Sequence, residues 1–208
     1  MSESKCKICR RQGVKLLIRG EKCLSPKCPM VRKPYVPGPR VKRRKNVSEY
    51  AKELKEKQKL KNWYNLSEGQ FKTYVKKTLS MRSKVENAAE FLINTLEKRL
   101  DNVIYRLGFA SSRAASRQLV THCHFMVNGK YINIPSYSVK KGDKITLVPS
   151  SSKKNIFKNI TAVLKRQTPP SWLKLNAEKV EAEVIGEPAF QEAAPPAEIS
   201  VIFEFYSR

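Results

Sequence analysis

Between residues 46 and 108 the apolar residues recur three or four positions apart, which is the spacing of amphipathic α-helices. A first helix is predicted to begin after Asn46 and a second after Ser67, because a glutamate or glutamine follows each of them three residues later and completes a capping pair. A third apolar stripe covers residues 88–107 without interruption. One helix is expected there, ending at Gly108.

The middle of the chain then changes from helical to strand patterning. A further helix is predicted from Ser111 to about His122, and its short connection to the helix before it makes a helical hairpin. Apolar runs at 125–127 and 130–132 flank Asn128-Gly129, a dipeptide typical of the two-residue turn between paired strands. Another strand is expected at 144–148. This part of the chain therefore predicts a helical hairpin followed by a small sheet.

The last forty residues alternate polar and apolar positions in two places. Residues 180–184 and residues 201–205 both follow the spacing of a strand. Between them lies EPAFQEAAPPAE, whose three prolines predict a loop.

The net charge of the chain indicates what kind of partner it binds. The 42 Lys and Arg residues against 18 Asp and Glu give a formal charge of +24, which implies a polyanion such as nucleic acid. Residues 1–80 carry a net +17, residues 81–166 a net +11 and residues 167–208 a net −4, so the polyanion is expected on the first two segments. No apolar run approaches the ~18 residues of a membrane span, and the first residues lack the apolar core of a signal peptide. We therefore expect a cytoplasmic protein.

A basic arm follows the first thirty residues. Three prolines and a glycine in VRKPYVPGPRVKRRKN exclude a helix, and an extended arm lying along phosphates is predicted in preference to a solvated linker. Its basic residues are Arg40, Lys42, Arg43, Arg44 and Lys45.

Four of the five cysteines are found near the N-terminus. Cys6 and Cys9 form C-x2-C, and after thirteen residues Cys23 and Cys28 form C-x4-C. Thiols stay reduced in the cytosol, and two short-spaced pairs suit one tetrahedral structural zinc ion with no open position for catalysis. A metal-free knuckle, an iron–sulfur cluster and a redox pair also fit this spacing. The zinc interpretation predicts a small, basic, folded knob.

Four arginines of the predicted helical hairpin fall on two faces. Arg113 and Arg117 are four residues apart on the second helix, whereas Arg99 and Arg106 are seven apart on the first. Their planar forks suit phosphates and base edges, and we expect them to face outward beside a groove floored by the Asn-Gly turn. An ordinary solvated helix face would show the same spacing. The candidate RNA contacts are Arg99, Arg106, Arg113, Arg117, Asn128 and Lys130.

The residues also resemble a known family. RLDNVIYRLGFASSRAASRQLV, VNGKYINIPSYSV and KKGD resemble the RNA-binding domain named after small-subunit ribosomal protein number four. SEYAKELKEKQKLK, QFKTYV, PSWL and the terminal FYSR resemble the rest of that family, and the cysteine-rich front resembles its zinc-carrying bacterial form.

The resemblance implies a structural protein of the small ribosomal subunit that functions in translation. It implies binding of ribosomal RNA at a helix junction, early nucleation of subunit assembly, and a place near the mRNA entry channel with a role in fidelity. The implied neighbour is ribosomal protein number five, and mRNA is a further possible contact. The RNA-facing positions that the resemblance implies are Arg99, Asp101, Arg106, Ser112, Arg113, Arg117, Gln118, His122, His124 and Asn128.

One position departs from the family pattern. Cys123 stands between His122 and His124, where the family usually has glycine. If this position needs a positive φ, cysteine there is strained in a way that glycine is not. We expect Cys123 to be a buried thiol that takes no part in metal binding.

Several further functions fit less well. Enzymes that carry the same small domain, such as pseudouridine synthases and tyrosyl-transfer-RNA synthetases, have catalytic domains too large for this chain, and no Gly-rich loop or nucleophile–base pair is present in the sequence. A free-standing RNA chaperone, an accessory of an RNA-modifying enzyme and a membrane-surface protein are also compatible with a basic chain, but they do not explain its motifs as well as a ribosomal protein does.

The predicted fold class is α+β, in which a small RNA-binding domain is inserted into a helical domain. Residues 1–45 form the four-cysteine zinc knob and the basic arm, and residues 46–97 form the helical domain. Residues 98–165 form the RNA-binding domain, with a helical hairpin and strands, and residues 166–208 return to the helical domain.

Overall fold

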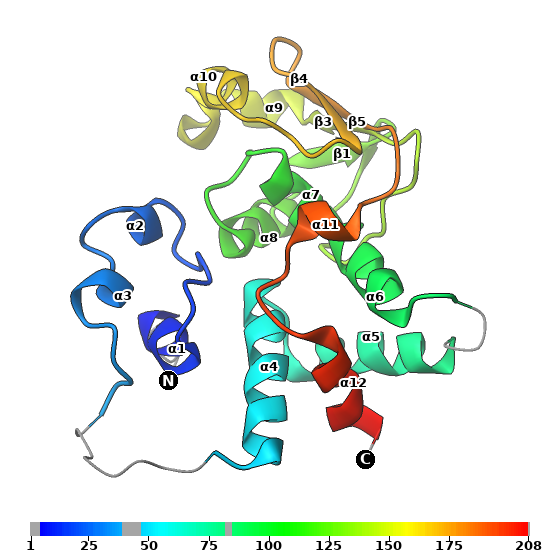
Figure 1. The fold of residues 1–208 in the computed structure, drawn as a ribbon. Helices are drawn as coiled ribbons and strands as arrows, with labels where there is room; N and C mark the ends of the chain where they lie inside the picture. The colour runs from blue at the N-terminus through cyan, green and yellow to red at the C-terminus, as the bar shows by residue number, and fades with distance from the viewer. Residues whose placement is uncertain (1–4, 39–46, 82–84, 208) are drawn as a thin grey trace. The chain divides into compact units, whose positions relative to one another are not determined.

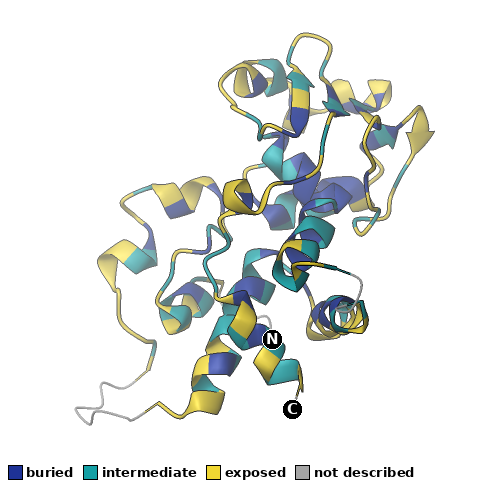
Figure 2. Ribbon diagram, turned by 45° about the vertical axis from the view of Figure 1, so that its right-hand side comes forward, coloured by how far each residue is buried: buried dark blue, intermediate teal, exposed yellow. Residues whose placement is uncertain are grey.

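The computed structural model describes residues 5–38, 47–81 and 85–207. The chain divides into two compact units, one formed by Met1–Ala89 with Pro195–Arg208 and the other by Glu90–Ala194. Figure 1 shows the elements of both units, and Figure 2 shows which of their residues are buried. Helices and antiparallel strands are both present, which agrees with the predicted α+β class.

The first unit begins with three short helices: α1 (Lys5–Gln12), α2 (Glu21–Leu24) and α3 (Pro29–Arg32). Gly13 ends α1 with a φ of 72°, a value that favours glycine. These short helices and the loops between them bring Cys9, Cys23 and Cys28 into buried positions.

Two longer helices follow, α4 (Glu49–Trp63) and α5 (Glu68–Ser80). Ser67 caps α5 as predicted, and its hydroxyl accepts a hydrogen bond from the backbone N–H of Gln70. The predicted cap of α4 is wrong by two positions. Ser48 is the N-cap, because its side chain accepts from the backbone N–H of Ala51, and Asn46 lies outside the described residues.

The C-terminal segment forms a different element from the one predicted. The spacing of residues 201–205 predicts a strand, but they lie in helix α12 (Ile199–Ser207), which packs on α4 and α5. Lys57 of α4 is held there, with its ammonium 2.7 Å from the Glu68 carboxylate and 4.4 Å from the centre of the Phe205 ring. The Tyr206 hydroxyl donates to the same Glu68 carboxylate at 3.3 Å. These contacts, with buried Ile202, need the helical spacing.

The second unit contains the predicted helical hairpin, but the first helix is broken. The stripe at 88–107 forms α6 (Ala88–Glu97) and α7 (Leu100–Arg106), and Arg99 between them has an extended conformation. Arg99 forms an isolated antiparallel β-bridge with Ser138, and the backbone carbonyl of Lys98 accepts a hydrogen bond from the N–H of Val139. The segment near residue 138 therefore takes the backbone hydrogen bonds that a continuous helix would use here.

Helix α8 (Arg113–Thr121) completes the hairpin and matches the predicted span closely. Its cap is Ser112 instead of the expected Ser111, because the Ser112 hydroxyl accepts from the backbone N–H of Ala115.

A five-stranded antiparallel sheet lies in the same unit, in the order β2-β1-β3-β5-β4. Its first three strands are as predicted to within a residue at each end, and Asn128 and Gly129, with φ of 51° and 77°, form the expected hairpin turn. The strands are β1 (Phe125–Val127), β2 (Lys130–Tyr131), β3 (Lys144–Leu147), β4 (Leu173–Asn176) and β5 (Glu181–Val184).

Short helices complete this unit. The predicted loop at 187–198 contains one of them, so that prediction is only partly right. The short elements are α9 (Pro149–Ser152), the 3-10 helix η2 (Asn155–Phe157), α10 (Ile160–Lys165) and α11 (Phe190–Ala193).

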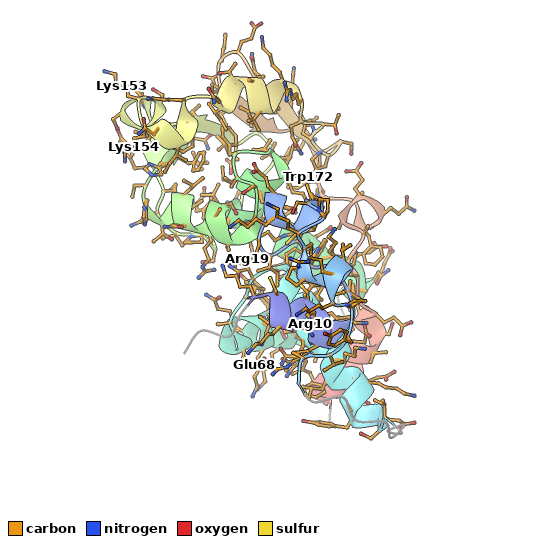
Figure 3. The ribbon with its side chains drawn as sticks, turned by 90° about the vertical axis from the view of Figure 1, so that its left-hand side faces the viewer. Arg10, Arg19, Glu68, Lys153, Lys154 and Trp172 are labelled. Carbon is orange, nitrogen blue, oxygen red and sulfur yellow. The ribbon has the colours of Figure 1, made fainter. Side chains whose placement is uncertain are left out.

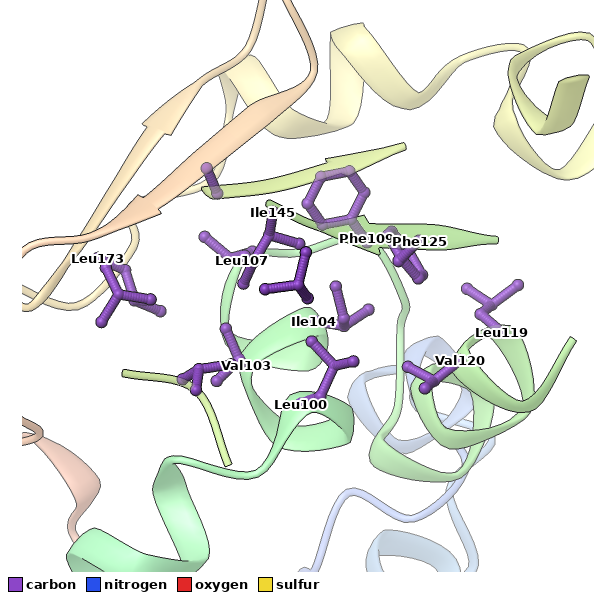
Figure 4. Packing of buried hydrophobic residues seen from close by; sticks show 14 of the residues in the cluster. Leu100, Val103, Ile104, Leu107, Phe109, Leu119, Val120, Phe125, Ile145 and Leu173 are labelled. Atoms are coloured by element: carbon purple, nitrogen blue, oxygen red, sulfur yellow. The ribbon is translucent and has the colours of Figure 1, made fainter. Parts of the chain in front are cut away.

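The core of the second unit lies between the helical hairpin and one face of the sheet (Figure 4). Leu100, Val103 and Ile104 of α7 pack against Phe125 of β1 and Ile145 of β3, and all five are fully buried. Side chains at alternate strand positions enter this core, so the sequence alternation determines which sheet face is buried. The hairpin helices therefore stand on a rigid base.

Candidate nucleic-acid interface

Arg113 begins α8 but does not face outward. Only 7% of the residue is exposed, its Nε donates to the Asn102 side-chain oxygen at 2.8 Å, and its guanidinium stacks 4.5 Å from the centre of the Tyr105 ring. The prediction of an outward arginine is therefore wrong at this position. Arg113 joins α8 to α7, and Asn102 and Tyr105 fix its guanidinium in place.

The side chains of Arg106 and Asn102 donate hydrogen bonds to the same buried carboxylate. Glu97, at the end of α6, is 1% exposed and accepts from Arg106 Nε at 3.0 Å and from Arg106 Nη2 at 2.9 Å. The amide of Asn102 donates to Glu97 Oε2 at 2.7 Å. A chain of hydrogen bonds thus runs from Glu97 through Asn102 to Arg113.

A second buried carboxylate forms ion pairs with two more of the arginines. Asp101 is 5% exposed, and Arg99 donates to its two oxygens at 3.0 and 2.6 Å. Arg117 reaches Asp101 Oδ2 at 3.4 Å, but a third of its side chain stays exposed. Arg99 itself is buried and precedes α7, so it does not share a helix face with Arg106 as predicted. Of the four predicted arginines, Arg117 keeps the most surface available for a ligand.

Glu97 was missed by the sequence-based site prediction, although a signal was present. Residues 93, 97, 101 and 104 share one stripe of the helical pattern, and Ile93 and Ile104 in that stripe are fully buried. An acidic residue on a buried stripe needs a cationic or hydrogen-bonding partner. The two carboxylates therefore indicated that some arginines would turn inward.

The remaining hairpin residues take different roles. Ser112 is the buried N-cap of α8, and Gln118 and His122 are exposed. His124 is buried, and its Nδ1 lies 2.8 Å from the Ser151 hydroxyl. Burial lowers the pKa of His124, and the positive charge of Lys154 and the neighbouring His122 lowers it further.

Cys123 lies where helix α8 ends. Its φ is 55°, its N–H donates to the Val120 carbonyl, and the N–H of His124 donates to the Leu119 carbonyl. These two bonds form a Schellman motif whose left-handed position is normally glycine. The positive φ on which the expected strain depends is present, but the expectation of a buried thiol is wrong, because Cys123 is exposed.

The hairpin turn adds lysines to this unit. Lys130 is exposed beside Asn128, and Lys140, Lys141 and Lys144 are exposed in the segment that leads into β3. The predicted contacts Arg40, Lys42, Arg43, Arg44 and Lys45 lie outside the described residues.

The four N-terminal cysteines line one recess. Cys6, Cys9, Cys23 and Cys28 form its walls together with Lys15 and Arg19. The Arg19 backbone N–H donates to Cys23 Sγ at 3.3 Å, and the Arg19 guanidinium lies 3.7 Å from Cys6 Sγ. Figure 3 shows Arg19 and the α1 residue Arg10 in this part of the first unit.

The recess is not arranged as a finished metal site. Burial raises the pKa of the Cys9 thiol. A hydrogen bond with the Leu16 backbone lowers this pKa in part, and the other three thiols raise it. Within residues 5–38, 47–81 and 85–207, no group of three or more His, Cys, Asp or Glu side chains is placed so that it could hold a metal ion. The predicted zinc knob therefore stays a prediction.

In the part of the chain that the structure describes, no helix is long and apolar enough to cross a membrane.

Comparison with known proteins identifies the family. Residues 1–97 match the family model described as the ribosomal protein S4/S9 N-terminal domain, and residues 98–145 match the S4 domain. The small ribosomal subunit protein uS4 of Halothermothrix orenii is 44% identical over 204 residues, which are 98% of this chain and 96% of the relative. The chain belongs to the uS4 family. The uS4 protein of Caldicellulosiruptor bescii is 43% identical over 203 residues, again 98% of this chain and 96% of the relative.

Membership of the uS4 family makes this a structural protein and not an enzyme. The S4-domain match covers α7, α8 and the β1–β2 hairpin, where the four arginines, Asp101 and the exposed lysines lie, and Glu97 is the last residue of the N-terminal match.

Proposed function

We propose that the protein is a structural component of the cytoplasmic small ribosomal subunit and binds its ribosomal RNA directly. The observation that carries this proposal is the match over 98% of the chain to relatives named small ribosomal subunit protein uS4. The formal charge of +24 supports it, because RNA phosphates are the polyanion that such a surface attracts.

The finer part of the proposal concerns where and how the RNA is bound. RNA helices hide their base edges in a deep major groove, so a protein that grips a helix junction contacts phosphates, 2′-hydroxyls and shape. The partly exposed Arg117 and the exposed Gln118 and Lys130, on a rigid α8 and hairpin, suit this kind of contact. From the resemblance we also propose early nucleation of assembly, a place near the mRNA entry channel, and ribosomal protein number five as a neighbour.

Reconstitution of the small subunit tests this proposal. Purified small-subunit RNA and proteins are assembled with and without this chain, and the products are separated on sucrose gradients. The proposal predicts that the chain sediments with the particle and that its omission leaves particles lacking several later-binding proteins. If the chain stays at the top of the gradient and omission changes nothing, a free-standing RNA chaperone becomes the better account.

We also propose that Cys6, Cys9, Cys23 and Cys28 hold one structural zinc ion. The two short-spaced cysteine pairs and their shared recess support this proposal. Bound zinc would fold the basic N-terminal segment without catalysing a reaction, since four thiolates leave no open coordination position. Lys15 and Arg19 in the recess wall would balance the negative charge of the thiolates.

Metal analysis tests the zinc proposal independently of RNA binding. Native protein purified without chelator is expected to contain one zinc per chain, with four fewer alkylatable thiols than protein treated with a chelator. Cys9→Ser is expected to lose the metal, whereas Cys123→Ser keeps it. A metal-free native chain with all five thiols reactive would contradict the proposal. Iron in the purified protein, together with absorption of visible light, would indicate an iron–sulfur cluster in place of zinc.

A further inference from the structure

Both polar atoms of the Asn128 side chain form hydrogen bonds within the protein. Its amide nitrogen donates to Asp143 Oδ1 at 2.9 Å, and its amide oxygen accepts from the Lys144 N–H at 2.9 Å. The backbone N–H of Asn128 also donates to the Lys144 carbonyl at 2.8 Å. Three bonds therefore fasten the tip of the β1–β2 hairpin to the start of β3, so the amide has a structural task that competes with the RNA contact predicted for it.

Asp143 holds a second turn with its other oxygen. Its Oδ2 accepts from the Lys140 N–H at 2.8 Å, and its own N–H donates to the Lys140 carbonyl at 3.1 Å. Residues 140–143 thus form a closed β-turn, in which Gly142 has the φ of 89° that a type II turn requires. One buried carboxylate, 8% exposed, connects the hairpin tip to this turn.

The exposed charged side chains of the two fastened turns are all basic. Lys130, Lys140, Lys141 and Lys144 are all exposed, and among the described residues none of the four ammonium groups has an acidic partner. The turns meet at one end of the β1–β3–β5 part of the sheet (Figure 1). Because the backbone at each lysine is fixed, these four charges form a preorganised edge.

We propose that Asn128 and Asp143 are positioning residues that hold Lys130, Lys140, Lys141 and Lys144 as one rigid edge for contacts with RNA phosphates. This inference rests on the proposed ribosomal RNA binding and adds to it. Fixing the turns before binding lowers the conformational entropy that is lost when the lysines engage the RNA.

The negative charge of Asp143 makes the inference sharply testable. By electrostatics alone, Asp143→Asn raises the net charge by one unit above the formal +24 and strengthens RNA binding. By positioning, the variant weakens binding, since a neutral amide offers one acceptor where two donors, from Asn128 and Lys140, need acceptors. The two accounts predict changes of opposite sign.

The experiment measures binding of the full chain to small-subunit ribosomal RNA over a range of salt concentrations. For Asp143→Asn we expect about tenfold weaker binding and a slope of log affinity against log salt that is shallower by about 1, the loss of roughly one phosphate contact. Asn128→Gly removes the side-chain bonds to Asp143 and to the Lys144 N–H without a change in charge, and it keeps the positive φ of the turn. The bond between Asp143 and the Lys140 N–H stays in place, and weaker binding in the same direction is expected.

Controls separate positioning from charge and from folding. Glu178→Gln adds the same unit of charge at an exposed site between β4 and β5, and we expect its affinity to stay within twofold. Circular dichroism and thermal melts show whether each variant is folded at the binding temperature. Folded variants that bind as tightly as the wild type, or more tightly, would overturn the inference. A wild type that does not prefer small-subunit RNA would instead overturn the proposed function.

Discussion

The carboxylate of Glu97 accepts two hydrogen bonds from the guanidinium of Arg106, and the carboxylate is almost fully buried. A buried charge is tolerated in a fold only when it is paired and its other hydrogen bonds are satisfied. Asn102 supplies a further bond to Glu97, and the network continues to Arg113. Arginines that were expected to contact RNA therefore build the hairpin on which the RNA-binding surface is proposed to lie.

Glu97→Gln is expected to destabilise the second unit by about 3 kcal/mol, because it leaves the Arg106 charge partly buried without its partner. Chemical denaturation followed by circular dichroism measures this change. Glu187→Gln is the matched control, since the exposed Glu187 pairs with Lys98 at the surface, and a change within about 0.5 kcal/mol is expected there. Equal effects of the two changes would contradict a structural role for the Glu97 network.

Substitutions of Arg113 and Arg117 are expected to affect different properties, folding stability for Arg113 and RNA binding for Arg117. Arg113→Ala removes a buried guanidinium that bonds Asn102 and stacks on Tyr105, so a loss of about 2–4 kcal/mol of folding free energy is expected. Arg117→Ala removes a partly exposed side chain, so weaker RNA binding is expected with a loss of stability below about 1 kcal/mol. Denaturation and filter binding on both variants measure this, and the reverse pattern would contradict the assignment.

Cys123→Gly is expected to stabilise the fold by roughly 1 kcal/mol, because glycine adopts the left-handed conformation without the cost to a side chain. Cys123→Ala keeps the side-chain carbon and is expected to leave stability unchanged. Thermal denaturation compares the two variants. In the wild type, iodoacetamide is expected to label exposed Cys123 before buried Cys9, Cys23 and Cys28. Slow labelling of Cys123, or a destabilising glycine, would show that the end of α8 is built differently.

The depressed pKa of His124 predicts a loss of stability at mildly acid pH. The folded state disfavours the protonated form of His124, while in the unfolded chain it takes up a proton near its ordinary pKa of about 6.5. The unfolded state then binds more protons, so this contribution is fully present above pH 6.5 and is lost as pH falls below that value towards the folded pKa. Urea denaturation at several pH values between 7.5 and 5 measures the effect.

Two variants test the origin of this pH dependence. His124→Gln is expected to flatten the dependence, because it removes the titrating group. Ser151→Ala removes the hydrogen bond to the ring, so it is expected to lower stability at every pH but to keep the slope. A wild type whose stability does not change across this range would contradict a neutral, buried His124.

Local signals in the sequence predicted much of the second unit. Asn128-Gly129 indicated the hairpin turn, and the apolar residues of α7, α8 and the first three strands were found from their spacing. The break at Arg99 was missed because its cause is a distant pairing with Ser138, which no local pattern records. The α12 helix was missed because Val201, Phe203 and Phe205 also fit strand spacing, and the contacts of Phe205 and Tyr206 with Lys57 and Glu68 decide between the two structures.

The sequence indicated which helices carry the candidate arginines, but not how their side chains are oriented. The arginines do gather around α7 and α8, but Asp101 holds Arg99 and Glu97 holds Arg106 towards the protein. Asn102 holds Arg113 in the same way. Spacing on a helix shows which side chains share a face, and the choice between water and a buried carboxylate depends on the neighbouring helix. Asp143 was overlooked for the same reason, since its two partners lie in different turns.

The affinities of the chain for two ribosomal RNAs show whether it recognises small-subunit RNA specifically. The full chain is titrated, at one salt concentration near physiological ionic strength, against small-subunit ribosomal RNA and against a large-subunit fragment of equal length. We expect at least tenfold tighter binding to the small-subunit RNA, or about 1.4 kcal/mol. Equal affinity for the two RNAs would mean that the charge of +24 attracts any polyanion, and it would contradict specific recognition by this protein.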